Sequence, residues 1–167
     1  MEEKFLHAEE PEAERNLRFQ TRSDLNSTSA AKSFAGFDSA QLQGKFTFTA
    51  EEKLKSKKLI EQLFKEGKSV STNGFTLVYL VQPLRTFYPA QAGFSVPKRN
   101  FKHAVDRNRV KRLMREAYRL NKLPFYEKLA ARQKQLAVMF VYKGKALPTY
   151  EATTKAIVHC MNRISIA

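Results

Sequence analysis

The sequence predicts an α+β domain in which one sheet packs against helices. Helix and strand periodicities alternate along the chain in the order helix, strands, helix, strand, helix. The apolar run over residues 136–142 has no polar face, as in a strand that is covered on both sides. The chain has 167 residues, 43% of them hydrophobic, which suits one compact domain with a modest core.

Charge divides the chain near Gly44. Residues 1–44 hold five of the 30 Lys and Arg residues and eight of the 16 acidic ones, so the strong positive charge lies in residues 45–167. The first segment is rich in Ser, Thr, Asn and Gln and has few branched aliphatic side chains, a composition that does not support a packed core. We expect a disordered N-terminal extension over 1–44 and one folded domain over 45–167.

A first helix is predicted between Ser56, a good N-cap, and Gly67, a good terminator. Its apolar side chains fall within a narrow arc at about 100° per residue, which marks one helical face. They are Leu59, Ile60, Leu63 and Phe64. Residues 49–52 (Thr-Ala-Glu-Glu) have the form of a capping box, so a separate short turn is expected ahead of this helix.

Two strands are predicted before the next helix. Residues 75–81 are aromatic and β-branched, and residues 92–96 end at Pro97, which cannot donate to a sheet ladder. Because a short connection joins these two strands, they are expected to pair antiparallel. Residues 136–142 are expected to form the central strand, since both of their faces are apolar.

Residues 104–122 form the clearest helix, and Pro124 is expected to prevent its extension. Its apolar face consists of Val110, Leu113, Met114, Ala117 and Tyr118. A last helix is expected after Thr149 as N-cap. Its buried face consists of Thr153, Ala156, Ile157, Cys160 and Ile164. The single cysteine, Cys160, is therefore interpreted as a small core hydrophobe rather than a reactive thiol.

The polar face of helix 104–122 is cationic. The stretch from Lys98 to Lys122 holds ten Lys and Arg residues, with Asp106 and Glu116 as its acids. Opposite the apolar stripe lie Asn108, Lys111, Arg112, Arg115, Arg119 and Lys122, with Arg107 and Arg109 at the flanks. Guanidinium groups match phosphate oxygens bidentately, and like charges at i,i+4 destabilise an isolated helix, which suggests that a polyanion neutralises them. This pattern predicts RNA binding.

Several other classes of protein and site are disfavoured. The acidic N-terminus has no apolar run of a targeting segment, and no stretch approaches about 20 apolar residues, so we expect a soluble cytoplasmic protein. His7, His103 and His159 are scattered without metal-ligand spacing, so no cofactor is expected on the protein itself. Two-metal hydrolysis needs clustered carboxylates and metal-free cleavage needs placed histidines, which argues against a protein active site.

At residue level, the basic stretch resembles the signature of the bacterial ribonuclease P protein family. The resemblance rests on residues 94–99 (Phe-Ser-Val-Pro-Lys-Arg) and on residues 104–118, which contain Arg107-Asn108-Arg109, then Lys111-Arg112 and Arg115. It continues in residues 54–70 and 148–151 and covers about 46–165. Residues 100–103 depart from the family pattern, because this loop is one residue longer and lacks the usual glycine.

The resemblance implies a particular fold. Three helices and a single antiparallel or mixed sheet of about four strands follow the order α-β-β-β-α-β-α, as in domain 2 of ribosomal protein S5. It also implies a left-handed βαβ crossover through the basic helix, although about 98% of such connections are right-handed in general.

The resemblance also implies the site and the partners. The catalytic RNA of ribonuclease P would be contacted by the basic helix through Arg107, Asn108, Arg109, Lys111, Arg112 and Arg115, and Arg119 is a further RNA-binding residue of that helix. A cleft lined by Ile60, Phe64 and Ser95 would receive the 5′ leader of precursor tRNA, with the RNA-binding residues Lys98 and Arg99 near it. One protein would bind one RNA, and the RNA would hold Mg²⁺ and cut.

Two alternatives stay open on the sequence alone. Phe64 can stack on an unpaired base and Ile60 cannot, but the sequence alone favours the core for both residues. The chain could also be a structural RNA-binding protein of ribosomal type. A membrane-surface module fits less well, because the apolar face of the basic helix lacks Trp and bulky Phe.

Overall fold

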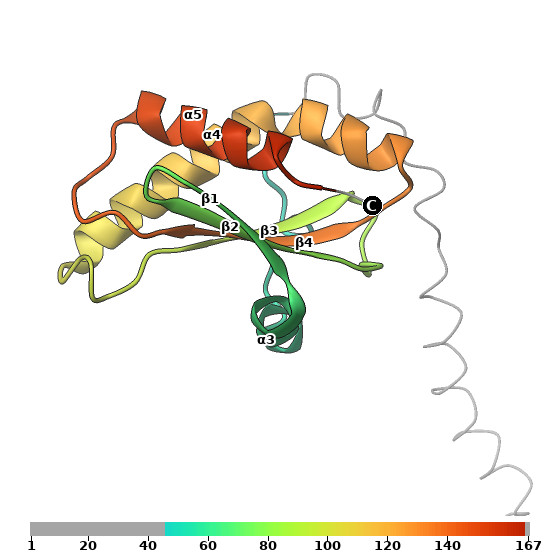
Figure 1. The fold of residues 1–167 in the computed structure, drawn as a ribbon, viewed down its shortest axis with the longest axis horizontal. Helices are drawn as coiled ribbons and strands as arrows, with labels where there is room; N and C mark the ends of the chain where they lie inside the picture. The colour runs from blue at the N-terminus through green and yellow to red at the C-terminus, as the bar shows by residue number, and fades with distance from the viewer. Residues whose placement is uncertain (1–45, 166–167) are drawn as a thin grey trace, which may run out of the picture. The chain divides into compact units, whose positions relative to one another are not determined.

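The computed structural model describes residues 46–165, so the extension expected over 1–44 lies outside the described residues. Within these described residues, three helices and four strands follow one another in the predicted order, which confirms the fold class (Figure 1). They are α3 (Lys57–Glu66), β1 (Lys68–Thr72), β2 (Phe75–Val81), β3 (Ala90–Ser95), α4 (Ala104–Ala131), β4 (Leu136–Tyr142) and α5 (Tyr150–Asn162).

The four strands form one mixed sheet in the order β1-β2-β4-β3. β2 runs antiparallel to β1 and β4, whereas β3 runs parallel to β4. The prediction that β4 is central is confirmed, and the prediction that β2 and β3 pair with each other is wrong, because β4 lies between them. β4 is apolar on both faces, and the crossover through α4 inserts it where strands flank both of its edges.

Helices cover both faces of the sheet. α4 and α5 lie on one face and α3 lies on the other (Figure 1). Alternate residues of β4 serve the two layers: Val138 and Phe140 join the core beneath α4 and α5, whereas Ala137 and Met139 join the smaller cluster around Leu63 of α3. The strand is therefore buried from both sides.

α3 begins and ends where its capping residues predict. The Ser56 hydroxyl accepts a hydrogen bond from the Leu59 N–H, and the Gly67 N–H donates to the Leu63 carbonyl. Ahead of α3, the Thr49 N–H donates to the Glu52 carboxylate at 2.7 Å, which closes the short turn expected from the capping-box pattern. The chain then runs beside β3 and reaches α3.

α4 is longer than predicted, because it continues through Pro124 to Ala131. A proline inside a helix removes one backbone hydrogen bond and costs about 3 kcal/mol. The carbonyl that loses its partner belongs to Leu120, which is exposed to water. Beyond the proline, α4 buries Phe125, Tyr126 and Leu129, and this burial offsets the cost.

α5 confirms the last predicted helix. The Thr149 hydroxyl accepts from the Ala152 N–H at 3.2 Å, and all five residues of the predicted apolar face are buried. Among them, Cys160 is a free thiol in the core, as predicted.

Burial raises the pKa of the Cys160 thiol to about 11, against some lowering by Arg163. The unfolded thiol ionises near pH 9 while the folded thiol stays protonated, so we expect the free energy of unfolding to fall between pH 9 and about 11. The contribution is on the order of 2 kcal/mol and is complete below pH 9. Denaturant titrations over this pH range, compared with Cys160→Ala, measure it. Parallel pH dependences for the two proteins would contradict the expectation.

Candidate RNA interface

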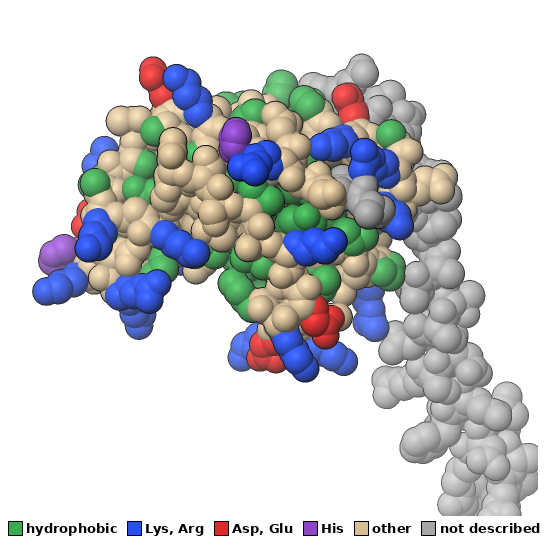
Figure 2. Space-filling model, viewed as in Figure 1, with side chains coloured by type: hydrophobic (Ala, Val, Ile, Leu, Met, Phe, Trp, Pro, Cys, Tyr) green, Lys and Arg blue, Asp and Glu red, His purple; other side chains and the backbone are tan. Residues whose placement is uncertain are grey.

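The outward side of α4 presents the cationic face that the sequence predicts. Asn108, Arg109, Arg112 and Arg115 are exposed, and Lys111 is partly buried, while the opposite side of the helix packs into the core. Within residues 46–165, no carboxylate forms an ion pair with Arg109, Arg112 or Arg115. We call the four exposed residues with Lys111 the basic face. Lys and Arg side chains also crowd the end of the domain where α4 begins (Figure 2).

The loop before α4 is anchored without the usual glycine. The Asn100 side-chain amide donates to the carbonyls of Lys143 at 2.8 Å and Gly144 at 3.2 Å. Phe101 is buried and packs against the ring of Tyr142, with 6.1 Å between the ring centroids. These contacts hold the loop in place, and Lys98 and Arg99, which precede Asn100, are exposed.

The same anchoring adds two cations that sequence reasoning missed. Lys143 and Lys145 are exposed in the segment after β4, and Asn100 holds that segment against the loop before α4. The signal was a Lys-Gly-Lys sequence directly after the most apolar strand. Nothing in the sequence placed it beside Lys98 and Arg99, because the contact joins two loops that are distant along the chain.

Arg107 differs from its neighbours in the Arg-Asn-Arg motif. It is partly buried, and its Nη1 donates to the carbonyls of Phe101 at 2.9 Å and Lys102 at 2.7 Å. Arg107 therefore braces the loop before α4, and its charge adds to the positive potential at the helix N-terminus. Asn108 and Arg109 are the members of the motif that point into solvent.

Arg119 lies one turn beyond the basic face and is already engaged. Its guanidinium pairs with Glu116, with contacts of 2.5 and 3.0 Å, and it also donates to the Phe46 carbonyl. The hydrogen bond from Arg119 lowers the pKa of Glu116, with smaller help from the charge of Arg112, against partial desolvation. Repulsion within the helix is thus relieved at Arg119 but not between Lys111 and Arg115.

Lys122 was expected on the outward polar side, and this expectation is wrong. Its side chain is 1% exposed and forms an ion pair with Glu52, which is 0% exposed. The Lys122 ammonium also donates to the Thr47 carbonyl, and the Tyr126 hydroxyl donates to Glu52 at 2.8 Å. The segment that precedes α3 covers this part of α4, which a helical wheel does not show. Desolvation raises the pKa of Tyr126 well above its ordinary value.

The three residues assigned to the leader cleft lie on the α3 side of the sheet. Ile60 is partly buried against the cluster of Leu63 and Met139, whereas Phe64 is 54% exposed. Ser95 is partly exposed at the end of β3, on the face opposite Ala92 and Phe94 because side chains alternate along a strand. Ile60 therefore lies at the margin of the core, and the core alternative is wrong for Phe64.

The described residues show neither a metal cluster nor a membrane span. No three His, Cys, Asp or Glu side chains come together within residues 46–165 in a way that could hold a metal ion. In that same range, every helix is too short or too polar to cross a bilayer.

The mixed sheet and the cationic side of α4 define an α+β domain of the RNA-binding class. The family model for ribonuclease P matches residues 48–165, which is most of the chain. The chain therefore belongs to the ribonuclease P protein family, as the resemblance in the basic stretch indicated.

Relatives agree with this assignment, and solved structures share the fold. The ribonuclease P protein component of Chlorobium phaeobacteroides is 35% identical over 124 residues, which cover 68% of this chain and 85% of the relative. The ribonuclease P protein component of Porphyromonas gingivalis is 36% identical over 121 residues, which cover 72% of this chain and 88% of the relative. The RNase P protein structure from Thermotoga maritima matches with a TM-score of 0.56 and 21% identity, over 68% of this chain and all of the other. The RNase P protein structure from Staphylococcus aureus matches with a TM-score of 0.54 and 19% identity, over 68% of this chain and 94% of the other.

Proposed function

We propose that this chain binds the catalytic RNA of ribonuclease P through the basic face and assists removal of the 5′ leader from precursor tRNA. The observation that carries the proposal is the set of exposed arginines on α4, which form no ion pair within residues 46–165. Lys98, Arg99 and Lys143 extend this positive surface beyond the helix. Such a surface lowers the repulsion between two polyanions that must meet.

In this proposal the RNA performs the chemistry. Two-metal phosphodiester hydrolysis needs carboxylates that converge on the ions. The acids of the basic stretch, Asp106 and Glu116, lie on different turns of α4, and Glu116 is held by Arg119. The RNA would supply the Mg²⁺ sites, and the protein would contribute binding and positioning, as one copy per RNA in the cytoplasm.

Phe64 is proposed to contact the leader, on the side of the sheet opposite to α4. Its exposed ring can stack on an unpaired base without selecting the sequence, an interaction worth about 1–3 kcal/mol. We expect Phe64→Ala to weaken binding of precursor tRNA by the holoenzyme by about tenfold and to leave mature tRNA unaffected. Equilibrium binding of the two tRNAs measures this, and equal losses for both would contradict a leader contact.

Reconstitution with ribonuclease P RNA tests the proposed function. At low Mg²⁺, where repulsion between the RNAs is least screened, the chain should restore cleavage of the 5′ leader from precursor tRNA. A structural RNA-binding protein of ribosomal type would bind RNA with a similar salt dependence but would not restore cleavage. An inactive mixture under conditions where the chain does bind the RNA would therefore favour that alternative.

A further inference from the structure

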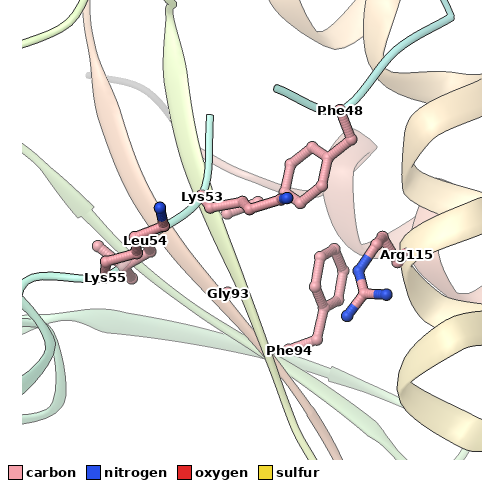
Figure 3. Close-up of a pocket in the computed structure, with 8 residues that line it drawn as sticks. Phe48, Lys53, Leu54, Lys55, Gly93, Phe94 and Arg115 are labelled. Atoms are coloured by element: carbon pink, nitrogen blue, oxygen red, sulfur yellow. The ribbon is translucent and has the colours of Figure 1, made fainter. Parts of the chain in front are cut away.

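A pocket of about 430 Å³ opens at the outer edge of β3, between the segment before α3 and the side of α4 (Figure 3). Two aromatic side chains and three cations converge on it: Phe48, Phe94, Lys53, Lys55 and Arg115. Its size falls within the range of ligand pockets, about 300–1,000 Å³. None of the cleft residues Ile60, Phe64 and Ser95 lines it.

The backbone arrangement creates this hollow. The segment before α3 pairs with the edge of β3 only at Ala92, which donates to the Glu52 carbonyl at 2.7 Å and accepts from the Leu54 N–H at 3.1 Å. At Gly93 the strand edge contributes no side chain. The Glu52–Lys122 ion pair fixes the same segment to α4, so the pocket is bounded by two elements that are held together.

The aromatic rings of Phe48 and Phe94 pack against other aromatic side chains of the core. Phe94 stacks on Phe140 at 5.6 Å between ring centroids, and Phe48 packs edge-on against Phe94 at 5.9 Å and Tyr118 at 5.8 Å. Both Phe48 and Phe94 are only partly buried. Rigid rings of this kind offer a surface for a flat partner at little cost in side-chain entropy.

Three cations, Lys53, Lys55 and Arg115, line the pocket together with the aromatic rings. The Lys53 ammonium lies 5.8 Å above the centroid of the Phe48 ring, and the Arg115 guanidinium lies beside the Phe94 ring (Figure 3). No carboxylate within residues 46–165 forms an ion pair with Lys53, Lys55 or Arg115. Sites for single-stranded nucleic acid combine aromatic faces on which a base stacks with cations that bind a phosphate.

We propose that this pocket binds one unpaired nucleotide, with its base against Phe48 and Phe94 and its phosphate between Lys53 and Arg115. The proposal rests on the proposed function, because it takes an RNA of the ribonuclease P particle as the source. An unpaired nucleotide of the catalytic RNA and a nucleotide of the precursor leader share this chemistry. Arg115 lies on α4, so the pocket continues the basic face around the edge of the sheet toward the α3 side.

Two substitutions in the full-length chain test the pocket within the reconstituted holoenzyme. Phe48→Leu keeps an apolar side chain and removes the ring, and Lys53→Gln removes an exposed charge without touching the core. Lys134→Gln removes an exposed charge outside the pocket and serves as the matched control. Thermal unfolding of each variant monitors the fold, and Lys53→Gln keeps the test valid if Phe48→Leu is destabilised.

The readouts identify the source of the nucleotide. If it comes from the catalytic RNA, Phe48→Leu and Lys53→Gln should each weaken binding of that RNA alone by about five- to tenfold, because each removes either the stacking on a base or the charge beside a phosphate. If it comes from the leader, binding of the RNA alone should be normal, and the preference for precursor over mature tRNA should fall by a similar factor. Lys134→Gln should change neither quantity.

Normal behaviour of both variants in both assays would overturn the pocket proposal while wild-type reconstitution still supports the proposed function. Failure of the wild-type chain to restore cleavage would instead overturn the proposed function. A crosslinking experiment provides a further test, with Phe48 replaced by the photoreactive p-benzoylphenylalanine in the holoenzyme. The crosslink should map to an unpaired nucleotide, and crosslinks confined to paired helices would also overturn the proposal.

Discussion

Replacing Lys122 with Met is expected to lower the free energy of unfolding by about 3–5 kcal/mol, because it leaves the Glu52 carboxylate buried without its counter-ion. Lys122 and Glu52 are almost completely inaccessible to water, and Tyr126 donates to the same carboxylate at 2.8 Å. The substitution also releases the segment that precedes α3, since Lys122 donates to the Thr47 carbonyl. Urea unfolding followed by circular dichroism measures the change.

The double variant Glu52→Gln with Lys122→Met separates the buried charge from side-chain packing. Because no uncompensated charge is left, it should recover a substantial part of the stability. Lys134→Met, at an exposed position after α4, is the matched control and should change stability by less than about 0.5 kcal/mol. If Lys122→Met were as mild as this control, the ion pair would not support the fold.

Replacing Arg109 and Arg112 together with Ala is expected to weaken binding of the ribonuclease P RNA by about 100-fold. A hydrogen bond to a charged group contributes about 1.5–3 kcal/mol, and each side chain is exposed and forms no ion pair within residues 46–165. The slope of log K against log salt should flatten by about 0.7–0.9 for each phosphate that the variant no longer neutralises. Filter binding over a series of KCl concentrations measures both quantities.

The stability of this double variant should be close to normal. The substitutions relieve repulsion between Arg112 and Arg115, but they also remove the attraction between Arg112 and Glu116, which lies one turn away. Lys134→Ala combined with Lys65→Ala removes the same charge from exposed positions away from the outward side of α4 and should change affinity only weakly. If charge-neutral replacements along the basic face left the holoenzyme assembled, the proposed mode of RNA binding would be refuted.

Arg107 shows how far the sequence could predict the site. Its place in the Arg-Asn-Arg motif and on the helical wheel predicted a cation on α4, and that prediction holds. Its engagement with the carbonyls of Phe101 and Lys102 could not be predicted, because it depends on how the preceding loop folds back. The same is true of Lys143, which reaches the interface only through Asn100.

The sequence by itself determined the features that depend on neighbours along the chain. Capping at Ser56 and Thr149, the buried face of α5 and the double-sided burial of β4 follow from local hydrogen bonding and from the periodicity of apolar residues. The basic face of α4 is of the same kind, since residues three and four apart lie on one side of a helix.

Only the tertiary structure decided the features that depend on residues distant in sequence. It placed β4 between β2 and β3, carried α4 through Pro124, exposed Phe64 and buried Lys122 against Glu52. For β4, Pro124 and Lys122, packing against a remote segment outweighs a local preference of up to a few kcal/mol, whereas Phe64 is exposed because no remote segment covers it within residues 46–165. A local pattern records which side of an element is apolar, but it does not record which other segment will cover that side or bring a charge to meet it.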